Sequence, residues 1–277
     1  MEEFRLMHCE INGLNYYIEE RGSGFPLILL HGFTGDCSTW EPFYQEWSGH
    51  SRLIAIDIIG HGKSDSPEQI ERYDMLSVTN DIKKILEQQL HIEKADLLGY
   101  SMGGRLALSF AILFPQMVRK LILESSSPGL ESETERENRR KQDEKLGLFI
   151  LEQGMEKFVD YWENISLFAT QKKLPSPKQE RVRKQRLKNS DIGLHNSLTG
   201  MGTGAQPSWW QQLHKIEAET LLVTGSLDEK FCLIAKKMMK KIKQCKWLEV
   251  DGSGHAIHVE NPDKFGTIMK RFLSNSN

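Results

Sequence analysis

The stretch Gly99-Tyr100-Ser101-Met102-Gly103 decides the fold of this chain. It follows the apolar run 95–98 and precedes a helix-forming run over residues 105–113. A strand, a serine between glycines and then a helix form the order of a nucleophile elbow, in which a sharp turn exposes the serine hydroxyl. The flanking glycines lack the Cβ atoms that would clash in such a turn. The pattern therefore predicts that Ser101 is a nucleophile, against the alternative of a chance Gly/Ser turn.

Composition and charge exclude several classes of protein. With 277 residues, 39% of them hydrophobic and 27% charged, the chain has the composition of an ordinary globular protein with one large α/β domain. Its formal net charge of −2 gives no electrostatic argument for nucleic acid or a membrane as partner. No apolar run approaches the roughly 20 residues that a membrane span requires.

The cysteines and the N-terminus indicate a cytoplasmic location. Cys9, Cys37, Cys232 and Cys245 are scattered without a C-x-x-C pair, which argues against a zinc site and fits reduced thiols. Residues 1–5 are charged and lack the basic and then apolar build of a signal peptide. We therefore expect a cytoplasmic protein.

Strand and helix patterns alternate over most of the chain. Apolar runs predict strands at residues 15–20, 27–30, 53–58, 95–98, 120–123, 220–224 and 246–250. Helical periodicity appears at residues 77–90, 105–113, 233–242 and 262–273. Such alternation is typical of βαβ units, and it predicts a mostly parallel sheet with helices on both faces.

The alternation breaks between residues 128 and 210, where the sequence is polar, helix-prone and poor in strands. We interpret this segment as a helical cap inserted into a core of residues 1–127 and 211–277. A disordered insertion is the alternative, but the segment has apolar side chains to bury, at positions 146, 149, 150, 158, 162, 165 and 168.

Two later loops supply partners for Ser101. Asp228 follows the predicted strand 220–224, and His255 lies on a glycine-rich loop after the predicted strand 246–250. Serine, acid and histidine then occur in the order used by the α/β-hydrolase fold. Because a serine hydroxyl needs a base, and an aspartate holds the imidazole in the right tautomer, the three residues predict a catalytic triad.

Rival candidates exist for both partners. His258 is an alternative base, and Glu124, at the end of a predicted strand, is an alternative acid. Asp57 and His61 lie in a glycine-rich loop, where an acid can tie down its own loop by hydrogen bonds. For that pair we favour a structural role.

The segment His31-Gly32-Phe33 follows the earliest buried strand, where the second donor of an oxyanion hole is expected. We assign the backbone N–H groups of Phe33 and Met102 to that hole, and we regard His31 as a substrate contact.

Basic residues suggest an anionic substrate. Arg105 lies one helical turn after Ser101, and a cation in the first turn opposes the helix dipole. Breaking a local rule beside a nucleophile suggests a use, although an arginine paired to a structural acid is an equal alternative. Residues 139–141 and the run 172–188 are also basic; most such charges are solvated, so we expect one or two to reach the site.

Longer motifs indicate a family. The stretches G-T-G-A-Q-P-S-W-W at 202–210, S-L-D-E-K-F at 226–231 and G-H-A-I-H-V-E-N-P at 254–262 stand beside the G-Y-S-M-G-G-R segment at 99–105. Together they resemble the 2-succinyl-6-hydroxy-2,4-cyclohexadiene-1-carboxylate synthases of menaquinone biosynthesis (the MenH family), and the match extends over essentially the whole chain.

The resemblance implies a lyase that abstracts a ring proton from a polycarboxylate and expels pyruvate, without an acyl-enzyme, a metal or an organic cofactor. By position it implies Ser101, Asp228 and His255 as the triad. It also implies substrate contacts at five positions: Tyr100, Arg105, Arg139, Trp162 and Arg186. Lys188 is an alternative to Arg186, because the alignment of the Lys/Arg run shifts by a residue or two. Trp162 could equally be a core anchor of the cap.

Two other functions stay open at this point. The same triad would serve a carboxylester or C–C-bond hydrolase, and a non-catalytic receptor could keep the fold. We expect a small polycarboxylate as the binding partner, and a monomer or weak homo-oligomer.

Overall fold

The computed structural model describes residues 4–274. Residues 1–3 and 275–277 lie outside the described residues. The expectation about a signal peptide and the two ends of the predicted core fall partly on these residues.

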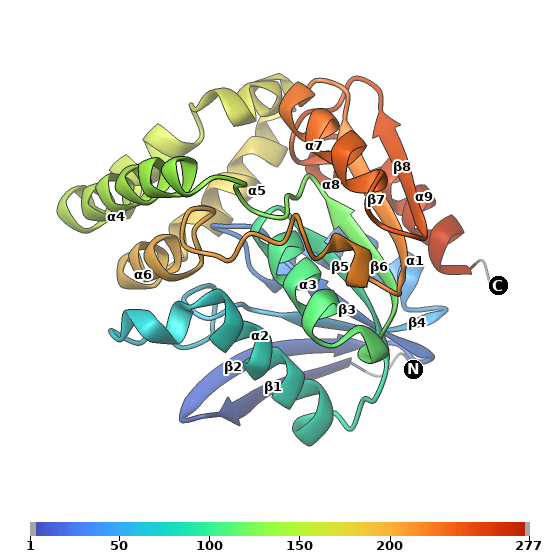
Figure 1. Cartoon of the computed structure of the whole chain (residues 1–277). Coiled ribbons are helices and arrows are strands. Elements are labelled where there is room, and N and C mark those ends of the chain that lie inside the picture. Colours follow the sequence, from blue (N-terminus) through green and yellow to red (C-terminus); the bar gives the residue numbers. More distant parts are fainter. Residues whose placement is uncertain (1–3, 275–277) are drawn as a thin grey trace.

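A single eight-stranded sheet runs through the molecule in the order β1-β2-β4-β3-β5-β6-β7-β8 (Figure 1). β1 pairs with β2 and β2 with β4 in antiparallel fashion, whereas all pairs from β4 to β8 are parallel. The strands are β1 Phe4–Ile11, β2 Leu14–Arg21, β3 Phe25–Leu30, β4 Ser51–Ile56, β5 Ala95–Tyr100, β6 Val118–Glu124, β7 Glu219–Gly225 and β8 Cys245–Val250. The predicted mostly parallel sheet is confirmed.

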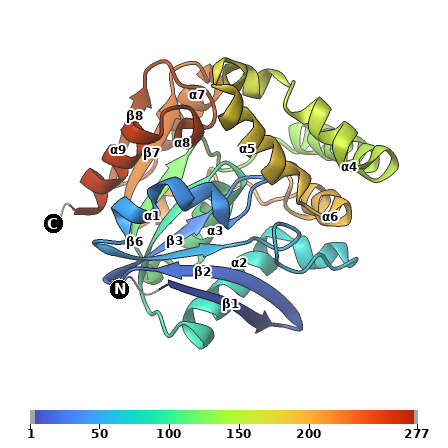
Figure 2. The same ribbon diagram turned by 180° about the vertical axis from the view of Figure 1, so that it is seen from behind.

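Helices cover both faces of this sheet. Helices α2 (Met75–Lys84), α3 (Met102–Leu113) and α7 (Glu229–Met239) lie on the face toward the viewer in Figure 1. Helices α1 (Glu41–Trp47), α8 (Ile257–Glu260) and α9 (Pro262–Ser274) lie on the opposite face, which Figure 2 shows. Short helical turns complete the described chain: η1 Cys37–Trp40, η2 Ile70–Tyr73, η3 Ile85–Gln89, η4 Pro115–Met117, η5 Ser166–Lys173 and η6 Leu213–Lys215.

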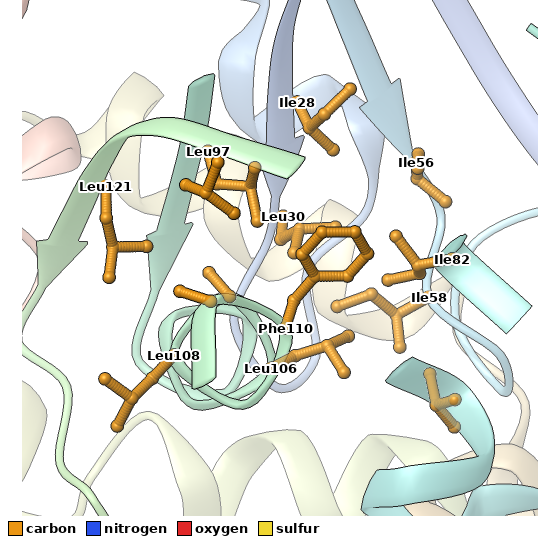
Figure 3. Packing of buried hydrophobic residues seen from close by; sticks show 14 of the residues in the cluster. Ile28, Leu30, Ile56, Ile58, Ile82, Leu97, Leu106, Leu108, Phe110 and Leu121 are labelled. Carbon is orange, nitrogen blue, oxygen red and sulfur yellow. The ribbon is translucent and has the colours of Figure 1, made fainter. Parts of the chain in front are cut away.

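The buried strand β3 shows why the sheet needs both layers. Its side chains alternate, so Ile28 and Leu30 join the core under α2 and α3, where they pack near Phe110 (Figure 3). Leu27 and Leu29 join the other core, which the aromatic residues of α1 fill. A strand apolar at every position is thus buried on both sides, as in parallel sheets generally.

The remaining differences from the sequence-based expectations lie at edges and ends. Strand β1 and helix α1 were not predicted, because β1 is an edge strand whose mixed side chains are mostly exposed and α1 spans only seven residues. Helix α2 begins earlier than predicted and continues as the π-helical turn η3.

Residues 128–210 form a layer of helices above one end of the sheet (Figure 1). They are α4 (Glu133–Trp162), α5 (Ser176–Leu187) and α6 (Asp191–Met201). Helix α4 is kinked at Gly154, which has a φ of 78°. Ile150 and Phe158 are fully buried against Leu194 of α6, so this segment has its own apolar core. The boundaries of the cap as a domain stay a prediction.

None of the helices within residues 4–274 combines the length and the apolar composition that a membrane crossing requires.

Candidate active site

Ser101 lies in a strained turn between β5 and α3. Its φ of 49° and ψ of −104° are outside the usual regions for a residue with a side chain. The backbone N–H of Ser101 donates to the carbonyl of Glu124 at 2.9 Å, which ties the turn to the end of β6. A Cβ on Gly103 would overlap the main-chain carbonyl oxygens of Leu30 and His31. The glycine therefore lets α3 start directly against β3.

The structure brings Ser101, His255 and Asp228 together in one hydrogen-bonded chain. The Ser101 Oγ lies 3.0 Å from Nε2 of His255, and Nδ1 of the same ring lies 2.6 Å from Oδ2 of Asp228. Asp228 and His255 are both buried. With a proton on Nδ1, donated to the carboxylate, Nε2 is left to accept the serine proton.

Main-chain hydrogen bonds join the loop that carries Asp228, after β7, to the loop that carries His255, after β8. The N–H of Ser226 donates to the carbonyl of Val250, and the N–H of Leu227 donates to the carbonyl of Ser253. Asp228 also caps α7, because its side chain accepts from the N–H of Phe231. These hydrogen bonds therefore fix the position of Asp228 relative to His255.

The amides predicted for an oxyanion hole flank the same serine. Met102 is the first residue of α3, and Phe33 follows β3 in a loop that packs on Tyr100. Within residues 4–274, neither N–H donates to a backbone carbonyl outside the regular helices and strands. Both residues line the cavity that contains Ser101.

The cavity beside Ser101 is positively charged. It has a volume of about 180 Å³ and lies between the sheet and the cap. Among the residues of the described chain that line it are the cations Arg105, Arg139 and Lys230, and no aspartate or glutamate. This lining favours an anionic ligand.

Arg105 also has structural partners. Its guanidinium donates to the carbonyl of Met201 at 2.6 Å and to the side chain of Gln206. Burial lowers the pKa of Arg105 to about 10; nearby Arg139 lowers it as well, whereas Asp143 raises it. Since these hydrogen-bond partners are neutral, no direct ion pair within residues 4–274 balances the charge of Arg105.

Arg139 and Trp162 bring the cap to the cavity. Arg139 Nε donates to Asp143 at 2.8 Å, and the second oxygen of that buried carboxylate has no hydrogen-bond partner among the described residues. Burial raises the pKa of Asp143, against the effect of Arg139. Trp162 stacks with Phe158 and makes an edge contact with Phe33, so it both lines the cavity and anchors the cap.

Two predicted substrate contacts lie outside this cavity. His31 is fully buried, with Nδ1 at 2.8 Å from the carbonyl of Gly32 and Nε2 accepting from the N–H of Ile58. Both ring nitrogens are therefore used within the fold, and Nε2 joins the loop after β3 to the loop after β4. Arg186 is buried behind Phe168 and lines a neighbouring cavity, whereas its competitor Lys188 is exposed.

The rival acid and the rival base are bonded to each other. Nδ1 of His258 lies 3.0 and 2.9 Å from the two carboxylate oxygens of Glu124. Glu124 is fully buried and also accepts from the N–H of His258. The geometry thus separates two pairs, His255 with Asp228 and His258 with Glu124.

Asp57 and His61 are used within the fold. Asp57 accepts hydrogen bonds from the N–H groups of Cys37 and Lys63 at 2.6 and 2.7 Å. His61 is buried, and burial lowers its pKa to about 3, with nearby His31 adding to the shift. These contacts agree with a structural role.

Sequence reasoning missed several residues of the cavity. Lys230 lies two residues after Asp228 in the D-E-K-F segment, a position that could have signalled its approach to the site. Ser125, Ser126 and Ser127 follow β6 at the same sheet edge. Ligands bind at the carboxyl ends of parallel strands, and that rule applied to β6 would have found the serines.

In the part of the chain that the structure describes, no group of three or more histidine, cysteine or acidic side chains could hold a metal ion. All four cysteines there are free.

Comparisons with known proteins agree with this geometry. A family described as "alpha/beta hydrolase fold" matches residues 26–262. The chain therefore belongs to the α/β-hydrolase fold family.

Individual relatives within this fold family show which enzymes the chain resembles. A Bacillus subtilis (strain 168) protein named "Putative 2-succinyl-6-hydroxy-2,4-cyclohexadiene-1-carboxylate synthase" is 44% identical over 95% of this chain and 96% of its own length. The synthase of that name from Photorhabdus laumondii is 29% identical over 90% of this chain and 85% of its own. The solved structure of MenH from S. aureus has a TM-score of 0.88 and 36% identity, covering 93% of this chain and 97% of that one. The resemblance to the MenH family is confirmed.

Proposed function

We propose that this protein is a carbon–oxygen lyase of menaquinone biosynthesis. It would convert 2-succinyl-5-enolpyruvyl-6-hydroxy-3-cyclohexene-1-carboxylate into 2-succinyl-6-hydroxy-2,4-cyclohexadiene-1-carboxylate and pyruvate. The names of the relatives support the product, and the cationic cavity beside Ser101 supports a polycarboxylate substrate.

The structures of substrate and product define the bonds that change. The ring loses the proton at C2, which lies next to the succinyl ketone, and it loses the enolpyruvyl oxygen at C5. The electron pair of the C2–H bond forms the C2=C3 double bond, the former C3=C4 pair moves to C4=C5, and the C5–O bond breaks. The leaving group is the enolate of pyruvate, which takes up a proton at carbon.

The three hydrogen-bonded side chains would act as a base relay. His255 Nε2, 3.0 Å from Ser101 Oγ, accepts the serine proton while that oxygen removes the proton from C2. Asp228, 2.6 Å from Nδ1, stabilises the imidazolium that forms. The imidazolium can return its proton to the departing enolate, so the enzyme ends in its initial state.

The amides of Phe33 and Met102 would stabilise the intermediate charge. Removing the C2 proton places negative charge on the succinyl ketone oxygen, as in an enolate. Preorganised N–H donors act on such developing charge in a site that excludes water. Arg105, Arg139 and Lys230 would hold the carboxylates of the substrate.

The observation that carries this proposal is the hydrogen-bonded chain from Asp228 to Ser101, opening into a cavity lined by cations. Purified protein should release pyruvate from the enolpyruvyl substrate at micromolar concentration, with ultraviolet absorbance from the conjugated diene. Absence of both products would contradict the proposal.

A hydrolase is the second candidate, because the same chain of hydrogen bonds also activates a serine for acyl transfer. That function predicts a burst and acylation of Ser101 with activated esters. A trace esterase activity would not decide between the two, so relative kcat/KM for the enolpyruvyl compound and for esters is the measurement required.

A further inference from the structure

Glu260, the last residue of α8, joins the loop of His255 to the helical segment above the sheet. Its carboxylate accepts a hydrogen bond from the backbone N–H of Gly254 at 2.7 Å and another from the hydroxyl of Thr170 at 2.9 Å. Gly254 directly precedes His255, and Thr170 lies in η5, within residues 128–210. One side chain therefore connects the base of the triad with the helical segment.

Position 254 is a glycine because of the space that this contact requires. Gly254 does not have a positive φ, so its backbone conformation is open to other residues. A Cβ on Gly254 would overlap Oγ1 of Thr170, and it would lie 3.0 Å from Cγ2 of Thr170 and 3.1 Å from Oε1 of Glu260. The missing side chain lets both groups reach the main chain directly before His255. The G-H-A-I-H-V-E-N-P segment thus supplies the donor Gly254 and the acceptor Glu260 of the same hydrogen bond.

The triad depends on the position of this main chain. Nε2 of His255 lies 3.0 Å from Oγ of Ser101, so a shift of the loop by about 1 Å away from the serine would break that hydrogen bond. The rings of Phe168 and Phe231 also contact the imidazole, with centroids 6.2 and 4.7 Å from its own. Such apolar contacts have little directional preference, whereas hydrogen bonds to a carboxylate are short and directional. Glu260 is therefore placed to fix where the imidazole begins.

We infer that Glu260 is a positioning residue for His255, and that Thr170 holds Glu260 in place. The inference rests on the proposed function, which makes His255 the base of the reaction. Glu260 acts through the N–H of Gly254 and does not touch the reacting atoms, because it does not line the cavity of Ser101. Its loss should therefore lower kcat and leave substrate binding nearly unchanged.

The variants Glu260→Ala and Glu260→Gln form the first test. Glu260→Ala removes both hydrogen bonds, and we expect kcat for pyruvate formation to fall about 10- to 100-fold, as for a catalytic group displaced by about 1 Å. KM should stay within about a factor of three, since the cavity lining is intact. Glu260→Gln should restore most of kcat, because its amide oxygen can accept from Gly254 while its NH₂ group donates to the hydroxyl of Thr170.

The variant Thr170→Val tests the link from the other side, and it serves if Glu260→Ala does not fold. Valine keeps the shape of the side chain and removes only the hydroxyl, so we expect kcat to fall about fivefold, in line with the loss of one hydrogen bond. Thr199→Val is the matched control. Thr199 is also a half-buried threonine within residues 128–210, but its hydroxyl donates to the carbonyl of His195 in its own helix. This control should leave kcat and KM unchanged.

A fluorophosphonate probe measures the alignment of His255 without the lyase reaction. Oγ of Ser101 attacks the phosphorus, fluoride leaves, and Nε2 of His255 takes the serine proton. The final extent of labelling counts the folded sites, and the rate constant reports the alignment of base and serine. We expect Glu260→Ala to keep the extent of labelling and to lower its rate constant about as much as kcat.

The outcomes separate this inference from the proposed function. A lower melting temperature with unchanged kcat and labelling rate per folded site would show a purely structural role and overturn the inference, as would a change in KM alone. Equal labelling rates in Glu260→Ala and the wild-type protein would also overturn it. If the wild-type protein forms no pyruvate but Glu260→Ala still slows the labelling of Ser101, the lyase function fails while the role of Glu260 stands.

Discussion

Replacing Asp228 by asparagine should disable proton transfer while the fold is preserved. The side chain accepts from the N–H of Phe231 at 3.5 Å through one oxygen and contacts His255 through the other at 2.6 Å. In the variant the amide oxygen keeps the contact with the Phe231 N–H, and the amide NH₂ faces Nδ1. Asparagine caps helices about as well as aspartate, so α7 should be retained.

The expected loss of kcat follows from the tautomer of His255 in the variant. Two donors cannot face each other at this distance, so the histidine proton moves to Nε2, which then cannot accept the proton of Ser101. Loss of the acid in a triad lowers kcat by about 10³- to 10⁴-fold, or about 4–5.5 kcal/mol. Asp228 does not line the cavity, so KM should change little.

The assay couples pyruvate formation to NADH oxidation by lactate dehydrogenase, with diene absorbance as an independent signal. Glu124→Gln is the control, because that carboxylate is bonded to His258 instead of His255. We expect Glu124→Gln to keep most of kcat, because its carboxylate does not contact His255. If Asp228→Asn keeps more than a tenth of kcat, or if Glu124→Gln costs more kcat than Asp228→Asn, the assigned acid is wrong.

Three further changes test other parts of the structure. Arg139→Gln combined with Asp143→Asn removes a cavity guanidinium without leaving a buried unpaired acid. KM should rise about tenfold with an unchanged melting temperature, and an unchanged KM would contradict a direct contact between Arg139 and the substrate. Gly103→Ala should destabilise the protein by about 3 kcal/mol in urea unfolding, because its Cβ overlaps backbone carbonyls, whereas Gly13→Ala, with open space around its Cβ, should cost about 1 kcal/mol. The folded-state pKa of His61, about 3, is below its unfolded value of 6.5, so the unfolded chain binds this proton first and stability falls as pH drops from 6.5 toward 3. The loss from this residue is about 2 kcal/mol at pH 5, and urea titrations of His61→Gln should show a shallower fall than those of the wild-type protein.

Local patterns in the sequence were sufficient for most of the fold. The apolar runs locate every strand of the parallel part of the sheet. The inner strands β3 to β7 are largely buried and rich in apolar residues, whereas the edge strand β8 is mostly exposed and mixed in composition. Edge strand β1 and the short helix α1 were not predicted. Both depend on the strand or core against which they pack, and the local sequence does not show those contacts.

The candidate site divides in the same way. The chain order of Ser101, Asp228 and His255, together with the glycines around the elbow, follows from local sequence, because loops after parallel strands must meet at one edge of the sheet. Which acid faces which histidine was decided only by tertiary structure. His255 and His258 are three residues apart, and only the packing of α8 on β6 turns one ring to Glu124 and the other to Asp228.

The positions of the charged side chains were likewise only partly predictable from the sequence. The sequence by itself determined an elbow, a parallel sheet and two basic stretches at 139–141 and 172–188, since each depends on residues close together in the chain. Only the tertiary structure decided that Arg139 reaches the Ser101 cavity while Arg186 lies behind Tyr100, and that His31 serves the backbone instead. The physical reason is that a side chain's partners are set by which elements pack together, and those contacts join residues far apart in sequence.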